Sequence, residues 1–178
     1  MELDMKGRPE WILLLIVLGG CATRTGDVSQ RMLLPEGVAR YDMEPHQAFV
    51  FPVPLGNVAP AVPAQFEARE LRPTTVCVAF VVDEHGDTSG VAPLEQPGCE
   101  MHAAIAPLLA EAVAAVQTWH FSPATFCKYP DAGARDRDWN GQGCAGQHVE
   151  ARIVPVSLAY SFTFEVRNGK GRVVSRKR

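Results

Sequence analysis

Hydrophobic residues alternate with other residues along two segments of the 178-residue chain, a spacing typical of β-strands with one buried face. In the first segment, residues 75–83, the alternate positions are large and apolar: Val76, Val78, Phe80 and Val82. In the second, residues 152–166, the even positions are apolar: Val154, Val156, Leu158, Tyr160, Phe162, Phe164 and Val166. Each segment therefore predicts a strand with one face in the core.

The residues after the first predicted strand favour a β-hairpin. Residues 83–87 (Asp-Glu-His-Gly-Asp) have the composition of a turn, and Gly86 is free to adopt a positive φ. A second, shorter strand is expected at residues 88–94, before Pro97 and Gly98 end it.

Residues 104–124 carry a helical pattern that ends in aromatic residues. Apolar side chains recur with helical spacing and form one stripe: Ile105, Leu108, Leu109, Ala112, Val113 and Val116. Pro107 is tolerated in the first helical turn, so the helix is expected to begin near Ala104–Ala106. Trp119 and Phe121 are expected to fill the end of the core, and Pro123 prevents the helix from continuing.

The order strand, turn, strand, helix, long strand predicts an α+β fold, a three-stranded antiparallel sheet covered on one face by a helix. We assign the folded domain to residues 72–166. Residues 21–71 contain six prolines and no sustained period, so an extended tether is expected, with a short strand or apolar patch at Ala48–Phe51. The basic residues 167–178 are expected to form a disordered tail, with contact to a phosphate-rich surface as the alternative.

The start of the chain has the organisation of an export signal. Lys6 and Arg8 precede the apolar run 11–18, which is too short to cross a bilayer because a spanning helix needs about 20 apolar residues. The sequence Leu-Gly-Gly-Cys that ends at Cys21 resembles the bacterial lipoprotein box. That resemblance implies removal of residues 1–20, a lipid on Cys21 and, because residue 22 is Ala rather than Asp, sorting to the outer membrane. A buried apolar strand or helix of the folded domain is the alternative.

Export changes the interpretation of the other cysteines, because an oxidising compartment favours disulfides. Four cysteines remain after Cys21, namely Cys77, Cys99, Cys127 and Cys144, and they predict two disulfides whose pairing the sequence leaves open. Cys127–Cys144 is the first choice, since these residues bracket one polar loop; closing about 15 residues contributes roughly 3 kcal/mol. A zinc site is the alternative, with the ligand spacing of Cys99-x-x-His102 and Cys144-x-x-x-His148.

Charge and motifs exclude several classes of protein. The formal net charge is −3, which gives no indication of a nucleic-acid-binding body. The sequence has no phosphate-binding glycine loop and no convincing nucleophile, and the acids Asp83 and Glu84 lie in the predicted turn. We therefore expect no enzyme activity, no cofactor and no metal. His120 is expected to act as a partner of the helix C-terminus.

The final predicted strand has features of a sheet edge. Pro155 has no N–H to donate, so it marks an edge or a bulge near the start of the strand. An edge presents a row of unpaired N–H and C=O groups, which is what an added strand requires. A solvated edge protected by Arg152, Glu165 and Arg167 is the alternative.

Taken in order, these segments resemble the TonB C-terminal domain over residues 62–166. The matching parts are Val76-x-Val78-x-Phe80, Gly86-x-Thr88-x-x-Val91, an alanine-rich helix, Trp119-x-Phe121-x-Pro123-Ala124, and Val154-Pro155-Val156. The Trp-x-Phe-x-Pro-Ala sequence at the helix end is the most specific of them. The resemblance implies a periplasmic module whose last strand pairs with a short extended segment of an outer-membrane transporter. In members that transduce energy, an inner-membrane complex of ExbB and ExbD type supplies the work.

This sequence departs from such transducers in three ways. The short run ending at Cys21 takes the place of the uncleaved membrane helix that contacts the motor, the tether lacks long Pro-Lys or Pro-Glu repeats, and residues 127–144 are an insertion. We therefore expect a lipid-anchored relative that binds an outer-membrane transporter or another envelope protein without pulling on it. Energy transduction would require that residues 1–20 be retained.

Binding is expected along the last strand, where backbone groups would supply the affinity and small outward side chains would leave room for the partner. The residues expected to carry it are Pro155, Val156, Ser157, Ala159, Ser161 and Thr163. A structural envelope lipoprotein, whose disulfide-stapled domain spaces or stabilises its neighbours, is the alternative from a different functional class.

Overall fold

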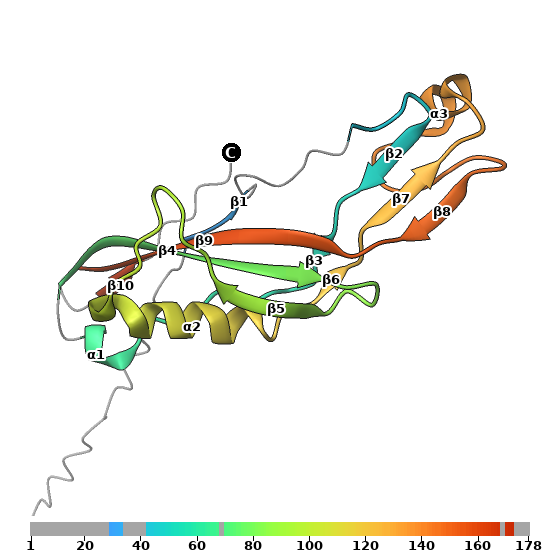
Figure 1. Cartoon of the computed structure of the whole chain (residues 1–178). Helices are drawn as coiled ribbons and strands as arrows, with labels where there is room; N and C mark the ends of the chain where they lie inside the picture. The colour runs from blue at the N-terminus through green and yellow to red at the C-terminus, as the bar shows by residue number, and fades with distance from the viewer. Residues whose placement is uncertain (1–28, 34–41, 68–69, 168–169, 173–178) are drawn as a thin grey trace, which may run out of the picture.

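A computed structural model describes residues 29–33, 42–67, 70–167 and 170–172, and these residues form an elongated body with a projecting arm (Figure 1). The body is a five-stranded antiparallel sheet with helices against one side. Its strands are β1 (Ser29–Leu33), β4 (Leu71–Val82), β5 (Thr88–Pro93), β9 (Val156–Arg167) and β10 (Lys170–Arg172). The strand order is β1-β9-β4-β5, and β10 also pairs with β9.

The antiparallel pair β4–β9 is the centre of the body. Both strands are 12 residues long, and their register sets Val76 opposite Phe162 and Val78 opposite Tyr160. Alternate residues of both strands point to one face and are buried, as the sequence periodicity predicts. This shared face is the floor of the hydrophobic core.

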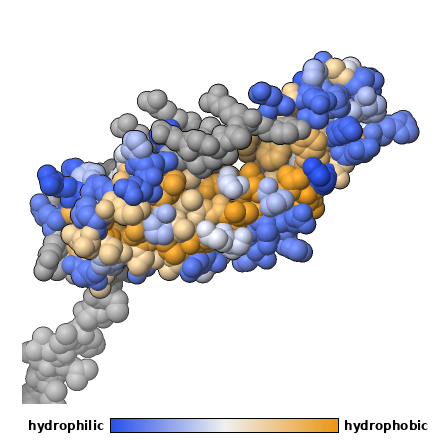
Figure 2. Space-filling view, viewed as in Figure 1, coloured by the Kyte–Doolittle hydropathy of each residue, from blue (hydrophilic) through white to orange (hydrophobic). Residues whose placement is uncertain are grey.

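Helix α2 (Ala106–Val116), preceded by the 3₁₀ turn η1 (Ala103–Ile105), covers that face. Pro107 lies in its first turn, as expected, and the side chains of Leu108, Ala112 and Val116 are fully buried against the sheet. Figure 2 shows hydrophobic residues in a band along the body, with hydrophilic residues at the tip of the arm. The predicted helix and its apolar stripe are therefore confirmed.

Aromatic rings close the end of the core beyond α2. Trp119 packs edge-to-face against Tyr160, with ring centroids 5.1 Å apart, and also contacts Phe80, Phe121 and Phe162. Its indole N–H donates to the carbonyl oxygen of Val58 at 2.7 Å, so the polar atom of a buried ring is satisfied. The sequence Trp-His-Phe thus anchors the helix end and fixes residues 55–58 as well.

The chain after α2 is fastened to the β4–β5 turn. The N–H of Phe121 donates to the carbonyl of Gly86 at 2.8 Å, and Gly86 has φ +87°. Asp83 stabilises the same turn by accepting the N–H groups of Asp87 and His85, and the bond from Asp87 is the main cause that lowers the pKa of its carboxyl. A glycine is required at position 86 because a Cβ there would lie 1.9 Å from the carbonyl oxygen of Phe121.

The projecting arm is a second sheet of order β2-β7-β8, made from β2 (Gln47–Val50), β7 (Thr125–Lys128) and β8 (Glu150–Ile153). Helix α3 (Ala132–Asp138) packs on it, with Asp131 accepting the N–H of Ala134 as its N-cap. Strands β3 (Val53–Pro54) and β6 (Phe121–Ser122) pair near the base of the arm, and α1 (Ala64–Glu67) follows β3 along the chain.

Two disulfides staple these parts. Cys127–Cys144 crosses the arm and confirms the first choice from the sequence, while Cys77–Cys99 ties β4 to the loop before α2. Both cysteines of the alternative zinc set are therefore engaged in disulfides, and they belong to different parts of the fold. Because that alternative needs free thiolates at Cys99 and Cys144, the structure contradicts it.

The α+β class is confirmed, but several boundaries are wrong. The main sheet has five strands rather than three, because β1 and β10 add to it. Parts of the expected tether form β1, β2, β3 and α1, and part of the expected tail forms β10. The expected strand 152–166 is divided between two sheets on either side of Val154 and Pro155, and the expected loop 128–143 contains α3.

The close approach at Gly86 can be tested with a matched glycine. Gly90 also has a positive φ, at +58°, but no atom lies within 4 Å of the position of a Cβ. We expect Gly90→Ala to lower the free energy of unfolding by about 1 kcal/mol through conformational strain. Gly86→Ala should lower it by about 2–4 kcal/mol, since overpacking adds roughly 1–3 kcal/mol. Urea unfolding measures both, and equal losses would contradict the contact with Phe121.

Candidate strand-docking edge

The outer side of β9, opposite β4, is already occupied over most of its length. Strand β1 pairs with Ala159–Thr163, and β10 pairs with Glu165–Arg167. Within the part of the chain that the structure describes, no strand pairs with the outer side of Val156–Leu158. β9 is therefore an edge strand over its first three residues and an internal strand beyond them.

This arrangement corrects the predicted binding edge. Pro155 precedes β9, Val156 and Ser157 lie on its unpaired beginning, but Ala159, Ser161 and Thr163 are paired with Leu33, Arg31 and Ser29 of β1. The expectation that these three residues lie on a free edge is wrong. The physical reason is that an unpaired row of main-chain groups is unfavourable, and segments from before and after the domain satisfy it.

Strand β1 makes a small contribution to the core. Gln30 and Met32 lie opposite Phe162 and Tyr160, on the side of the sheet that α2 covers. Met32 remains 38% exposed, and Arg31 is exposed on the other side. None of these three β1 side chains belongs to the core cluster. The main-chain ladder is therefore the principal attachment of β1 that the structure describes.

Gln30 is poorly accommodated at its position in β1. Its side-chain oxygen Oε1 is buried and accepts no hydrogen bond. A buried acceptor without a partner costs about 1–3 kcal/mol, so this residue weakens the pairing of β1 with β9. An apolar residue at position 30 would avoid this cost.

The opposite face of β9 is fixed by polar and covalent contacts. The hydroxyls of Thr163 and Thr75 are hydrogen-bonded at 2.8 Å across β9 and β4. Cys77, the cross-strand partner of Ser161, carries the disulfide to Cys99. The backbone of β9 is therefore held from the β4 side whether or not β1 is in place.

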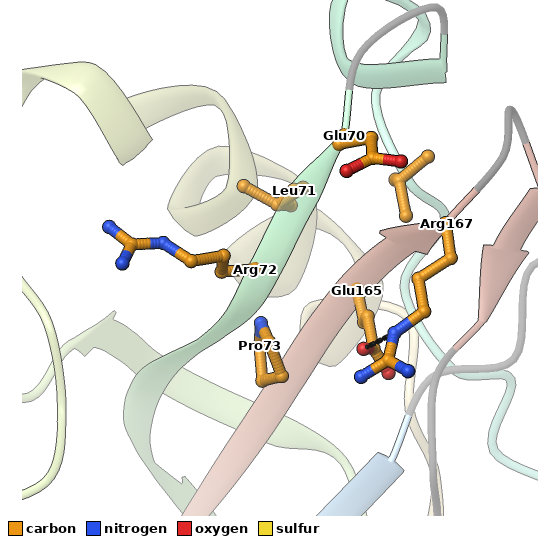
Figure 3. A pocket seen from close by; sticks show the side chains of 7 residues that line it. Glu70, Leu71, Arg72, Pro73, Glu165 and Arg167 are labelled. Atoms are coloured by element: carbon orange, nitrogen blue, oxygen red, sulfur yellow. Dashed lines mark hydrogen bonds and ion pairs between the residues drawn. The ribbon is translucent and has the colours of Figure 1, made fainter.

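A cleft of about 310 Å³ marks the far end of β9 (Figure 3). It forms where β4 bulges, since Arg72 and Pro73 together oppose the single residue Glu165. Glu165 is nearly buried and is paired with Arg167, whereas Figure 3 shows the Arg72 side chain pointing away from that pair. The cleft lies on the β4 side of β9 and has balanced charges, while β10 pairs with the outer side of β9 at the same end. Its lining residues are Glu70, Leu71, Arg72, Pro73, Glu165, Val166 and Arg167.

Gly86 and the residues of the Trp-x-Phe-x-Pro-Ala sequence lie away from the outer side of β9 and contribute to the packing of the domain. Trp119, Phe121 and Ala124 are buried, Pro123 is half-buried, and Gly86 forms the close contact described above. The expected capping role of His120 is wrong, because its Nδ1 lies 2.8 Å from a carboxylate oxygen of Asp87 and its N–H donates to Asn57. These residues shape the domain behind the edge.

The lipidation candidate Cys21 lies outside the described residues. Among the residues that are described, no three His, Cys, Asp or Glu side chains converge as metal ligands. The helices in the same ranges are all too short or too polar to span a bilayer.

Strands β1 and β10, the two segments that cover the edge, were not predicted from the sequence. Neither offers a usable signal, because five and three residues are too few to display a period. The scan of family models and the search of curated proteins find no match to this chain. The resemblance to the TonB C-terminal domain therefore stays a prediction from the sequence motifs.

The register of β1 predicts a specific cross-link. Directly opposed residues of antiparallel strands have Cα atoms about 4.5–5.5 Å apart, which suits a disulfide. Ser29 and Thr163 are such a pair, so the double variant Ser29→Cys, Thr163→Cys should form a disulfide on oxidation. Ser29→Cys with Ser157→Cys is the matched control, since position 157 lies six residues along β9. Peptide mapping identifies the bond, and cross-linking of the control alone would contradict the register.

Proposed function

We propose that this chain is a lipid-anchored protein of the bacterial envelope, on the periplasmic side of the outer membrane, that binds an extended segment of another envelope protein along β9. One observation carries the proposal. The outer side of β9 already holds an added antiparallel strand, β1, whose described side chains lie outside the hydrophobic core. Such an edge recognises main-chain groups first and side chains second, which is the physical basis of β-augmentation.

Docking would begin at Val156–Leu158, where no described strand lies on the outer side of β9. A partner that extends its pairing to Thr163 takes the place of β1, and each main-chain hydrogen bond contributes about 0.5–1.5 kcal/mol. On the face away from α2, Ser157 is exposed and Ser161 is half-buried, so these small side chains leave room for a partner, whereas Ala159 is already buried. The proposed binding residues are the ones expected from the sequence. The structure adds one requirement, because a partner must displace β1 to reach Ala159–Thr163.

The likeness to the TonB C-terminal domain supports an outer-membrane transporter as the partner. It consists of a hairpin, a covering helix, the Trp-x-Phe-x-Pro-Ala sequence at the helix end and a long final strand. The short apolar run ending at Cys21 argues for a lipid anchor in place of the membrane helix that would contact a motor of ExbB and ExbD type. We therefore propose binding without energy transduction.

A structural envelope lipoprotein is the second candidate. It is favoured by the exposed large side chains of Phe51, Val53, Leu55 and Val58, which lie between the arm and α1 in the sequence. No charged residue occurs between Gln47 and Phe66, so this segment offers an uncharged surface to a neighbour. In that case the edge of β9 would stay closed by β1.

Site-specific photo-cross-linking in cells separates the two candidates. A benzoylphenylalanine at the exposed position Ser157 lies on the unpaired start of β9, while one at the exposed Gln117 lies at the end of α2 and is the control. We expect position 157, and not 117, to yield an adduct with an outer-membrane protein. Mass spectrometry should place the cross-link in an extended segment of that protein. If benzoylphenylalanine at position 58 yields adducts and benzoylphenylalanine at position 157 yields none, the structural candidate is favoured instead.

A further inference from the structure

Strand β1 lies very close in the sequence to the proposed lipid anchor. Only seven residues separate Cys21 from Ser29, and a fully extended chain spans at most about 3.3–3.6 Å per residue. While β1 is paired, Ser29 can therefore lie no more than about 27 Å from the anchored residue. If β1 leaves the sheet, the first described residue is Asp42, and the limit rises to about 70 Å.

We propose that β1 sets the reach of the domain from the membrane, and that a docking strand releases the domain by displacing β1 from β9. The inference rests on the proposed function, since it takes from there the lipid on Cys21 and the docking edge on β9. It adds that binding and reach are coupled, because β1 and the partner compete for the same main-chain groups of Ala159–Thr163.

The geometry of the edge provides a starting point for displacement. Leu33, the last residue of β1, pairs with Ala159, directly beside the unpaired stretch Val156–Leu158. A partner strand that runs in the same direction as β1 pairs its C-terminal residues with this stretch. Displacement then proceeds from Leu33 towards Ser29, one residue at a time, with each lost hydrogen bond replaced.

Energetics favour a partner over β1 once it is bound at that stretch. A tethered strand competes at an effective concentration of order mM, so a partner must pair better than β1 does. A partner covering residues 156–163 makes three more residue pairs than the five of β1. It can also place an apolar side chain opposite Phe162, where β1 has Gln30 with a buried, unsatisfied oxygen. The preferred partner is therefore an extended segment with apolar residues opposite Phe162 and Tyr160.

The test uses the full-length protein isolated from membranes and placed in vesicles of phosphatidylethanolamine and phosphatidylglycerol. A donor fluorophore at position 84, in the exposed β4–β5 turn, reports distance from an acceptor lipid. The probe is the peptide Ser-Leu-Arg-Met-Leu-Thr-Val-Thr, which copies the five residues of β1 with leucine in place of Gln30 and adds three residues for the stretch 156–158. We expect the peptide to bind and to lower energy transfer about two-fold or more, as the permitted reach rises about 2.5-fold.

Four variants test this expectation. With Ser29→Cys and Thr163→Cys oxidised, β1 is locked, so peptide binding should be lost and transfer should stay high. The double variant Arg31→Pro, Met32→Pro removes two neighbouring N–H groups of β1. Neighbouring N–H groups point to opposite sides of a strand, so one of the two points to β9 and its hydrogen bond is lost, which releases β1. This variant should show low transfer without peptide and bind the peptide at least ten-fold more tightly, whereas Arg31→Ala with Met32→Ala should behave as the wild type. Gln30→Leu should strengthen β1 and weaken peptide binding about five-fold or more.

The outcomes separate the inference from the function on which it rests. If the peptide binds and transfer does not change, β1 does not control reach and the inference is overturned, while docking on β9 stands. If the released variant does not bind the peptide, the docking mode fails and the inference fails with it. Mass spectrometry of the N-terminus provides the last measurement. A protein without lipid on Cys21 has no anchor from which reach can be measured, and that result would overturn the inference.

Discussion

The antiparallel pairing of β4 with β9 is the constraint on which the rest of the structure depends. Two strands of 12 residues place alternate side chains on opposite faces in one shared register. One face carries the core against α2, and the other carries the Thr75–Thr163 contact and the Cys77–Cys99 disulfide. Because β4 holds β9 along almost its whole inner side, we propose that the outer side exchanges one strand for another without loss of the fold.

The residues between α2 and the arm connect the two sheets. Trp119 and Phe121 fill the core, the backbone of Phe121 is bonded to Gly86, and the chain then enters β7 after Ala124. The chain returns from the arm at Val154, whose N–H donates to the carbonyl of Ala124 at 3.1 Å. The aromatic residues before Ser122 and Pro123 therefore anchor the point at which the chain leaves the core for the arm.

The sequence was most informative where burial is periodic and local. The alternation in residues 76–82, the stripe of α2 and the turn at Gly86 each fix a feature within a short stretch of chain, and each was predicted. The division of residues 152–166 into β8 and β9 was not predicted, because Val154 continues the even apolar spacing across the break between the two strands. Pro155 was the single indication of that break. Asp131 as an N-cap would have revealed α3. Strand β1 had no local signal, since its partner lies about 130 residues away and the pairing is through main-chain groups.

The functional account depends on how readily β1 leaves β9. Native-state hydrogen exchange on the full chain measures this directly, because neighbouring amides of β9 point alternately to β4 and to β1. Along Ala159–Thr163 the account predicts an alternating pattern: amides directed to β4 exchange through global unfolding, and amides directed to β1 exchange faster, through a local opening that denaturant hardly affects. Equal protection of all five amides, rising and falling together with denaturant, would show that β1 is a permanent part of the fold and that β9 is not a docking edge.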